Sequence, residues 1–121
     1  MNNFILSLKA STLAKVQFWL ACVVITILAL SPVELVQNIF NWWDKAQHGL
    51  AFFALACMGL FAYPNTRWRM AFGLLAFGIT IEILQYLTGW RFAELSDVLA
   101  DVLGISLALV AMWSLQKQLK N

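Results

Sequence analysis

The sequence predicts an all-α protein, a compact four-helix transmembrane bundle that forms one domain over residues 1–121. Three observations predict it. Of the 121 residues, 62% are hydrophobic and 12% are charged, whereas a soluble domain is apolar over roughly half of its residues. The apolar residues gather in four runs, each close to the roughly 20 residues that cross ~30 Å of hydrocarbon. Backbone groups in lipid must be hydrogen-bonded internally, so these runs must be helices.

Each run has a boundary in the sequence. The helices are expected at about residues 13–31, 45–63, 68–88 and 95–116. The first closes at Pro32 and the second before Pro64, because proline interrupts a helix. Lys9 before the first run also fits a cleaved signal peptide. Because Pro32 follows the place where cleavage would occur, and three further runs follow, we expect a retained helix. Residues 32–43 are expected to lie at the interface as a short amphipathic segment, or to form a plain connector.

Basic residues set the expected orientation. Six of the eight lysines and arginines flank the same ends of the four helices: Lys9, Lys15, Arg67, Arg69, Lys117 and Lys120. Cytoplasmic flanks carry the excess of such residues, so both termini are expected in the cytoplasm of a multi-pass protein of the bacterial cytoplasmic membrane. The remaining cations and all six acidic residues then fall toward the outer face: Lys45, Arg91, Glu34, Asp44, Glu82, Glu94, Asp97 and Asp101.

Composition also limits the expected partners. A net charge of +2 without a basic stripe argues against nucleic acid. Cys22 and Cys57 lie in apolar runs and are expected to be small buried hydrophobes. No cofactor is expected. A single histidine without a nearby cysteine is a poor zinc-ligand set, so no metal is predicted, although the acidic residues leave an oxygen-rich Ca²⁺ or Mg²⁺ site open.

Ionisable residues interrupt the apolar runs near their outer ends. They form four motifs: Asp44-Lys45-x-x-His48, Glu82-x-x-Gln85, Arg91, and Ser96-Asp97-x-x-x-Asp101-x-x-Gly104. Charge in a bilayer is costly, so such side chains usually face a partner, a cavity or a substrate. A helix rises ~1.5 Å per residue, which puts three of the motifs at similar depth. We therefore expect one polar pocket near the outer face, whose unpaired carboxylates take up a proton or recruit a cation.

Three functions are compatible with these residues. The leading one is recognition of an anionic lipid or lipid-linked head group. Arg91 and Lys45 would hold the anion, and the remaining ligand-binding candidates are Gln85, Asp97 and Asp101, together with Glu82. The second is a membrane-embedded enzyme in which His48, oriented by Asp44, is the acid or base and Glu82 its partner.

The third function is purely structural. In this interpretation Asp44 and Ser96 cap helices, while Arg91 pairs with an acidic residue at the rim and Glu82 with Arg91 or Lys45. Below the polar layer, Gly104 and Ala108 continue the face of Asp101. Small residues there are expected to let the helices approach closely.

The order and spacing of the motifs resemble the VanZ-like family of small bacterial membrane proteins, over about residues 44–108. The resemblance implies a membrane protein of the cell envelope. The family is named after a protein associated with resistance to teicoplanin, which defines no reaction. Phe52 stands where the family often has tyrosine, Asp101 where asparagine is common, and Glu94 where serine is frequent. The pocket is thus expected to be unusually acidic.

Overall fold

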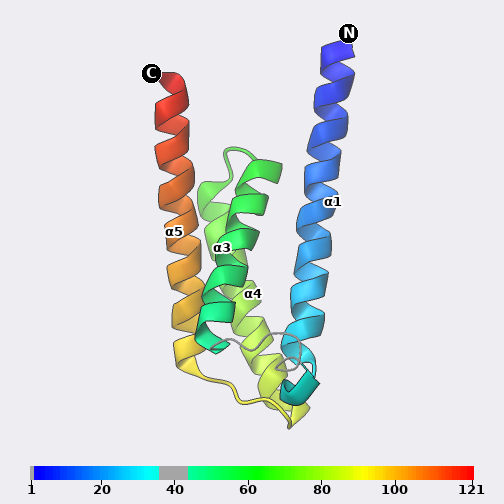
Figure 1. Ribbon diagram of the computed structural model, residues 1–121, viewed down its shortest axis with the longest axis vertical. Helices are drawn as coiled ribbons and strands as arrows, with labels where there is room; N and C mark the ends of the chain where they lie inside the picture. Colours follow the sequence, from blue (N-terminus) through cyan, green and yellow to red (C-terminus); the bar gives the residue numbers. More distant parts are fainter. Residues whose placement is uncertain (1, 36–43) are drawn as a thin grey trace.

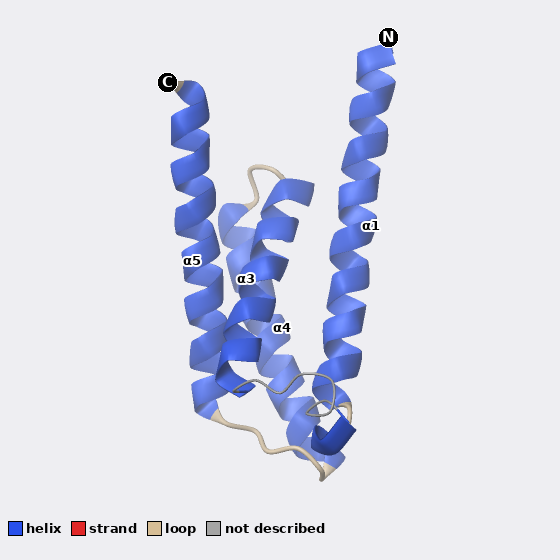
Figure 2. Ribbon diagram, viewed as in Figure 1, coloured by secondary structure: helices blue, strands red, loops and turns tan. Residues whose placement is uncertain are grey.

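The computed structural model describes residues 2–35 and 44–121, with side chains from residue 11 onward. Within these ranges it consists of helices and loops (Figures 1 and 2). The four long helices are α1 (Asn2–Leu30), α3 (Asp44–Ala62), α4 (Arg67–Thr88) and α5 (Leu95–Lys120). All four contain a stretch long and apolar enough to span a membrane. The prediction of an all-helical, multi-pass membrane protein is confirmed to that extent.

The helix boundaries agree with the prediction in the middle of the chain and differ at its ends. Both α3 and α4 begin and end within one residue of the expected positions. The first helix starts at Asn2 and the last continues to Lys120. No proline or glycine interrupts either flank, so the helices continue into polar sequence. Most of the expected interfacial segment, with Trp42 and Trp43, lies outside the described residues.

Helix α3 is the centre of the bundle (Figure 1). It packs most extensively against α5 and next against α1, while α4 contacts all three. A β-carbon on Gly104 of α5 would collide with the Gly49 carbonyl and lie 2.9 Å from the Phe53 nitrogen of α3. Ala108, one turn further, is fully buried. The close approach predicted at Gly104 and Ala108 is confirmed.

Away from its polar end, the interior of the bundle is apolar, and so is much of its outer surface. The most buried apolar side chains include Phe18, Phe52, Leu55, Leu74, Ile81 and Ile105. Large apolar side chains are also exposed on every helix, for example Leu20, Phe61, Phe72 and Leu103. Soluble monomeric proteins rarely expose an apolar surface of this extent, and such a surface is compatible with contact to lipid.

The two ends of the bundle differ in chemistry. The start of α1, the end of α5 and the turn between α3 and α4 lie at one end (Figure 1). The loop after α4 and the start of α3 lie at the other. Helix α4 ends at Thr88 and is followed by Gly89, whose left-handed φ of 78° permits the sharp turn. The predicted site residues gather at this second end.

The start of α5 corrects one expectation. Ser96 does not cap the helix, because α5 begins at Leu95 and Glu94 occupies the N-cap position without a side-chain capping bond. The Ser96 hydroxyl instead donates to Glu94 Oε2 at 3.1 Å. Asp97 lies in the first turn of α5, and Asp44 in the first turn of α3, where the helix dipole favours a negative charge.

Candidate functional site

His48 of α3 lies close to carboxylates of two other helices, α4 and α5, at the polar end of the bundle. Its Nδ1 lies 3.1 Å from Asp101 Oδ1 on α5 and 3.9 Å from Glu82 Oε1 on α4. The first distance is a hydrogen bond, and the second is too long for one. His48 is 9% exposed and Asp101 is 1% exposed. The carboxylate bonded to the imidazole is therefore that of Asp101, where the sequence analysis gave this role to Asp44.

Glu82 is held by the loop that precedes α5. Its Oε2 accepts a hydrogen bond from the Glu94 backbone nitrogen at 3.1 Å. Among the described residues, neither Arg91 nor Lys45 forms an ion pair with it. The structural ion pairs considered for Glu82, with Arg91 or with Lys45, are thus not formed among the described residues.

Lys45 bridges the first turns of α3 and α5. Its Nζ lies 2.7 Å from Glu94 Oε2 and 3.7 Å from Asp97 Oδ1. The Lys45 ammonium and the Ser96 hydroxyl hold the pKa of Glu94 below its usual value. Because Lys45 is engaged with Glu94, its charge is already neutralised in part.

Several buried oxygens have no hydrogen-bond partner among the described residues: Glu82 Oε1, Gln85 Oε1, Asp97 Oδ1 and Asp101 Oδ2. An unpartnered buried polar atom is uncommon and calls for an explanation. Asp101 Oδ2 lies beside Gly78 of α4, where a β-carbon would approach it to 2.6 Å. Sequence reasoning missed Gly78, although it is one turn before Glu82 on the same helix face.

Gln85 ties α4 to the end of α1. Its Nε2 donates to the Ala29 carbonyl at 2.9 Å, and the Trp90 indole donates to the Leu30 carbonyl at 3.0 Å. The last carbonyls of a helix lack intrahelical donors, so these two bonds satisfy groups that would otherwise be unpaired. The described contacts of Gln85 thus hold the helices together.

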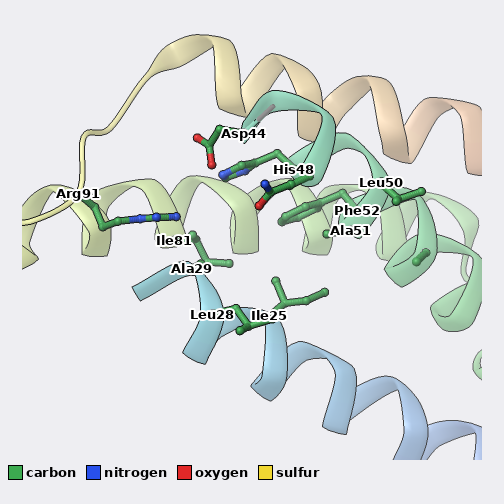
Figure 3. A pocket seen from close by; sticks show the side chains of 12 residues that line it. Ile25, Leu28, Ala29, Asp44, His48, Leu50, Ala51, Phe52, Ile81 and Arg91 are labelled. Atoms are coloured by element: carbon green, nitrogen blue, oxygen red, sulfur yellow. The ribbon is translucent and has the colours of Figure 1, made fainter. Parts of the chain in front are cut away.

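A cavity of about 350 Å³ lies between α1 and α3 beside this cluster. Figure 3 shows Asp44 and His48 side by side at its polar end, with the Arg91 side chain extending toward them from the loop. Ile25 and Leu28 of α1 stand opposite. The lining is otherwise mainly apolar, so the cavity has a polar end and an apolar body.

The predicted residues divide between this cavity and the packed cluster. Asp44, His48 and Arg91 line the cavity, whereas Lys45, Glu82, Gln85, Asp97 and Asp101 do not. His48 belongs to both, since it lines the cavity and bonds Asp101. The α1 side of the cavity, formed by Ile25, Leu28 and Ala29, was not predicted. These are ordinary apolar residues of a membrane-spanning helix, and nothing in the sequence distinguishes them from lipid-facing residues.

Arg91 carries an unpaired charge within the described part of the chain. No ion pair or hydrogen bond joins it to any residue in 2–35 or 44–121. The structural alternative, a rim pair of Arg91 with Glu94 or Asp97, is not formed among the described residues, where Lys45 contacts both carboxylates. A half-buried guanidinium that faces an apolar cavity is suited to meet an anion there.

One group of side chains in the described residues has the spacing of metal ligands. Asp44, His48 and Asp97 each offer a ligand atom, and these atoms lie within 4.8 Å of one another. Two of the three residues are buried.

One of three comparisons with known proteins identifies a family for this chain. The model of the VanZ/LLP1 family matches residues 4–116, nearly the whole chain. Neither the search of curated proteins nor that of solved structures gives a match. The match covers all four helices and the loop that carries Arg91, and it shows that the chain belongs to the VanZ/LLP1 family.

Proposed function

We propose that this chain binds an anionic lipid or lipid-linked head group of the bacterial cell envelope in the cavity between α1 and α3. The observation that carries the proposal is the position of Arg91. Its guanidinium faces a cavity with an apolar body and has no partner in the described residues. An amphiphile has the matching chemistry, with an anionic group for Arg91 and an acyl chain for the α1 wall.

The size and composition of the cavity support this proposal. At about 350 Å³ it falls within the range of small-molecule sites, roughly 300–1,000 Å³. Its body is formed by apolar residues such as Ile25, Leu28 and Phe52. A head group alone would leave this apolar surface uncovered, whereas a lipid tail would cover it. The lining therefore favours an amphiphile over a soluble anion.

The distribution of lysine and arginine supports an outer-leaflet location. The start of α3 and the loop after α4, which contribute Asp44, His48 and Arg91 to the cavity, lie at the opposite end of the bundle from the two termini (Figure 1). If the basic termini face the cytoplasm, Arg91 lies near the outer surface of the cytoplasmic membrane. Lys45 lies near the same end, but its contact with Glu94 leaves Arg91 as the main anion ligand.

Lipid retention by the purified protein tests the proposal. Protein in neutral detergent is titrated with phosphatidylglycerol or with phosphatidylcholine, and bound lipid is measured by native mass spectrometry. We expect phosphatidylglycerol to be preferred, Arg91→Ala to remove that preference, and Arg91→Lys to restore part of it. The control is Arg67→Ala, which removes an exposed arginine at the opposite end. Equal retention of both lipids, or loss of the preference in Arg67→Ala as well, would contradict the proposal.

A second function is supported by the hydrogen bond between His48 and Asp101. This bond fixes the imidazole at the cavity wall and leaves Nε2 unused by Asp101. An oriented imidazole beside a bound lipid is suited to proton transfer, with Glu82 as a nearby carboxylate. Labelled envelope lipids incubated with wild-type protein and with His48→Gln would show a His48-dependent product if the protein is an enzyme. An identical product profile from both would exclude His48 catalysis on those lipids.

A further inference from the structure

We propose that Asp44, His48 and Asp97 bind a divalent transition-metal ion at the polar end of the cavity. One ligand atom from each residue lies within 4.8 Å of the other two. Bonds of ~2.1 Å hold ligand atoms about 3–4 Å apart, so a small inward movement completes the site. Asp44 is exposed at the first turn of α3, where its short side chain can make that movement by rotating.

The buried state of Asp97 is the first support. This residue is 2% exposed, and its Oδ1 has no hydrogen-bond partner among the described residues. The nearest described cation, Lys45 Nζ, is 3.7 Å away and makes its shorter contact with Glu94. A buried carboxylate oxygen that has a 3.7 Å ion pair but no hydrogen bond is only partly compensated for the loss of water. A bound cation would satisfy this oxygen and leave the Lys45–Glu94 pair in place.

The orientation of His48 is the second and independent support. Asp101 Oδ1 lies 3.1 Å from Nδ1. In the tautomer that donates Nδ1–H to this carboxylate, Nε2 presents a lone pair. Histidines that bind metals commonly donate their other nitrogen to a carboxylate in this way. Asp101 would then be a positioning residue that fixes the tautomer of His48, and Gly78 provides the space for its second oxygen.

The donor set indicates the class of metal. One imidazole nitrogen and two carboxylate oxygens suit Zn²⁺ or Mn²⁺, whereas Ca²⁺ and Mg²⁺ favour oxygen alone. Two carboxylates also match the charge of a divalent ion. Because His48 and Asp44 line the cavity, the remaining coordination positions would be open toward it. The sequence alone predicted no metal, because a single histidine without a nearby cysteine is a poor zinc-ligand set. The packing of α3 on α5 brings Asp97 beside Asp44 and His48.

Metal binding does not rest on lipid binding, so it is tested without anionic lipid. A chain without a histidine tag is purified in neutral detergent, stripped with EDTA and dialysed against Zn²⁺ or Mn²⁺. Bound metal is measured by inductively coupled plasma mass spectrometry, and affinity by calorimetry. We expect about one ion per chain, a large loss of affinity in His48→Gln and Asp97→Asn, and a loss of about 10–100-fold in Asp101→Asn.

Two further variants make the result decisive. Asp44→Asn removes an exposed ligand, so it should lose metal, while its circular dichroism melting temperature without metal should fall only slightly, through the loss of a helix-dipole contact. Glu34→Gln removes an acid outside the cluster and should bind as the wild type does. Failure of the wild-type chain to retain Zn²⁺ or Mn²⁺ would overturn the proposal. So would unchanged affinity in Asp44→Asn, or displacement of the ion by equimolar Mg²⁺.

The same measurement separates this site from catalysis by His48. If Nε2 binds a metal ion, it cannot accept a proton at the same time. His48-dependent metal retention therefore supports the metal site and excludes His48 as the acid or base in the loaded protein. Failure of lipid binding through Arg91→Ala would leave this result unchanged.

Discussion

Gly78 of α4 makes room for the carboxylate of Asp101 on α5. A β-carbon at position 78 would lie 2.6 Å from Asp101 Oδ2 and 3.3 Å from the Phe52 ring. Asp101 in turn fixes His48 through Nδ1. A residue without a side chain on one helix thus sets the position of a carboxylate on a second helix and of an imidazole on a third. This relationship explains how α4 influences the cavity although its polar residues do not line it.

Gly78→Ala is expected to destabilise the bundle. The added methyl must displace either the Asp101 carboxylate or the Phe52 ring, and overpacking of this kind costs about 1–3 kcal/mol. Thermal denaturation in detergent, followed by circular dichroism, measures the loss. Gly73→Ala is the matched control, because a β-carbon there meets nothing within 4 Å. It should be neutral or gain up to about 1 kcal/mol from helix propensity. An equal effect of both substitutions would contradict the role of Gly78.

Gly104→Ala is expected to destabilise the protein more than Gly78→Ala does. The obstacle at position 104 is backbone, the Gly49 carbonyl and the Phe53 nitrogen, and backbone cannot rotate away as a side chain can. Helices α3 and α5 must move apart, which also separates His48 from Asp101. The order of melting temperatures, Gly73→Ala above Gly78→Ala above Gly104→Ala, tests this argument. A Gly104→Ala protein as stable as the wild type would show that the helices pack less closely.

The four helices, and the convergence of their polar side chains at one depth, could be predicted because a lipid bilayer permits few backbone structures. An apolar run must be a helix, and the fixed rise per residue gives the depth of each polar side chain. That depth is why His48, Glu82 and Asp101 could be expected at one level. Rotation of each helix about its axis is not fixed by depth. For that reason Asp44, one turn away on the same helix, was the expected partner of His48, and the contact with Asp101 was missed.

The cavity could not be predicted for a different reason. Its α1 wall consists of residues such as Ile25 and Leu28, which look the same in sequence whether they face lipid, a helix or a ligand. Only the packing of α1 against α3 shows which face is covered. The polar residues allow one end of the site to be predicted from the sequence, whereas the residues of the apolar end cannot be told from other membrane-facing residues.

The ion pair between Lys45 and Glu94 predicts a pH dependence of stability. The pKa of Glu94 is lower in the folded protein than the ordinary glutamate value of 4.5, mainly because Lys45 is bonded to it. A group with a depressed folded pKa stabilises the fold above its unfolded pKa and loses that contribution as the pH falls through the folded pKa. The melting temperature of the wild-type protein should therefore be slightly higher than that of Glu94→Gln at neutral pH. This difference in melting temperature should vanish when the pH falls below the pKa of Glu94 in the folded protein.

Salt provides the control for that experiment. Glu94 is largely exposed, so screening should shrink the neutral-pH difference at high ionic strength. The Glu94 backbone bond to Glu82 does not involve the side chain and is kept in Glu94→Gln. A difference that grows toward acid pH, or that is unaffected by salt, would be inconsistent with a stabilising surface pair.

Gln85→Met is expected to loosen the α1 wall of the cavity without removing any polar residue that lines it. The substitution keeps a similar volume but deletes the donor to the Ala29 carbonyl, and interhelical hydrogen bonds in membranes contribute about 0.6–2 kcal/mol. Hydrogen exchange at the last turn of α1 should accelerate, and phosphatidylglycerol retention should fall while Arg91 is intact. Trp90→Phe, which deletes the neighbouring bond to the Leu30 carbonyl, should act in the same direction, and the double variant more strongly. Unchanged exchange in the double variant would mean that these two bonds do not hold α1 in place, and that its packing against α3 suffices.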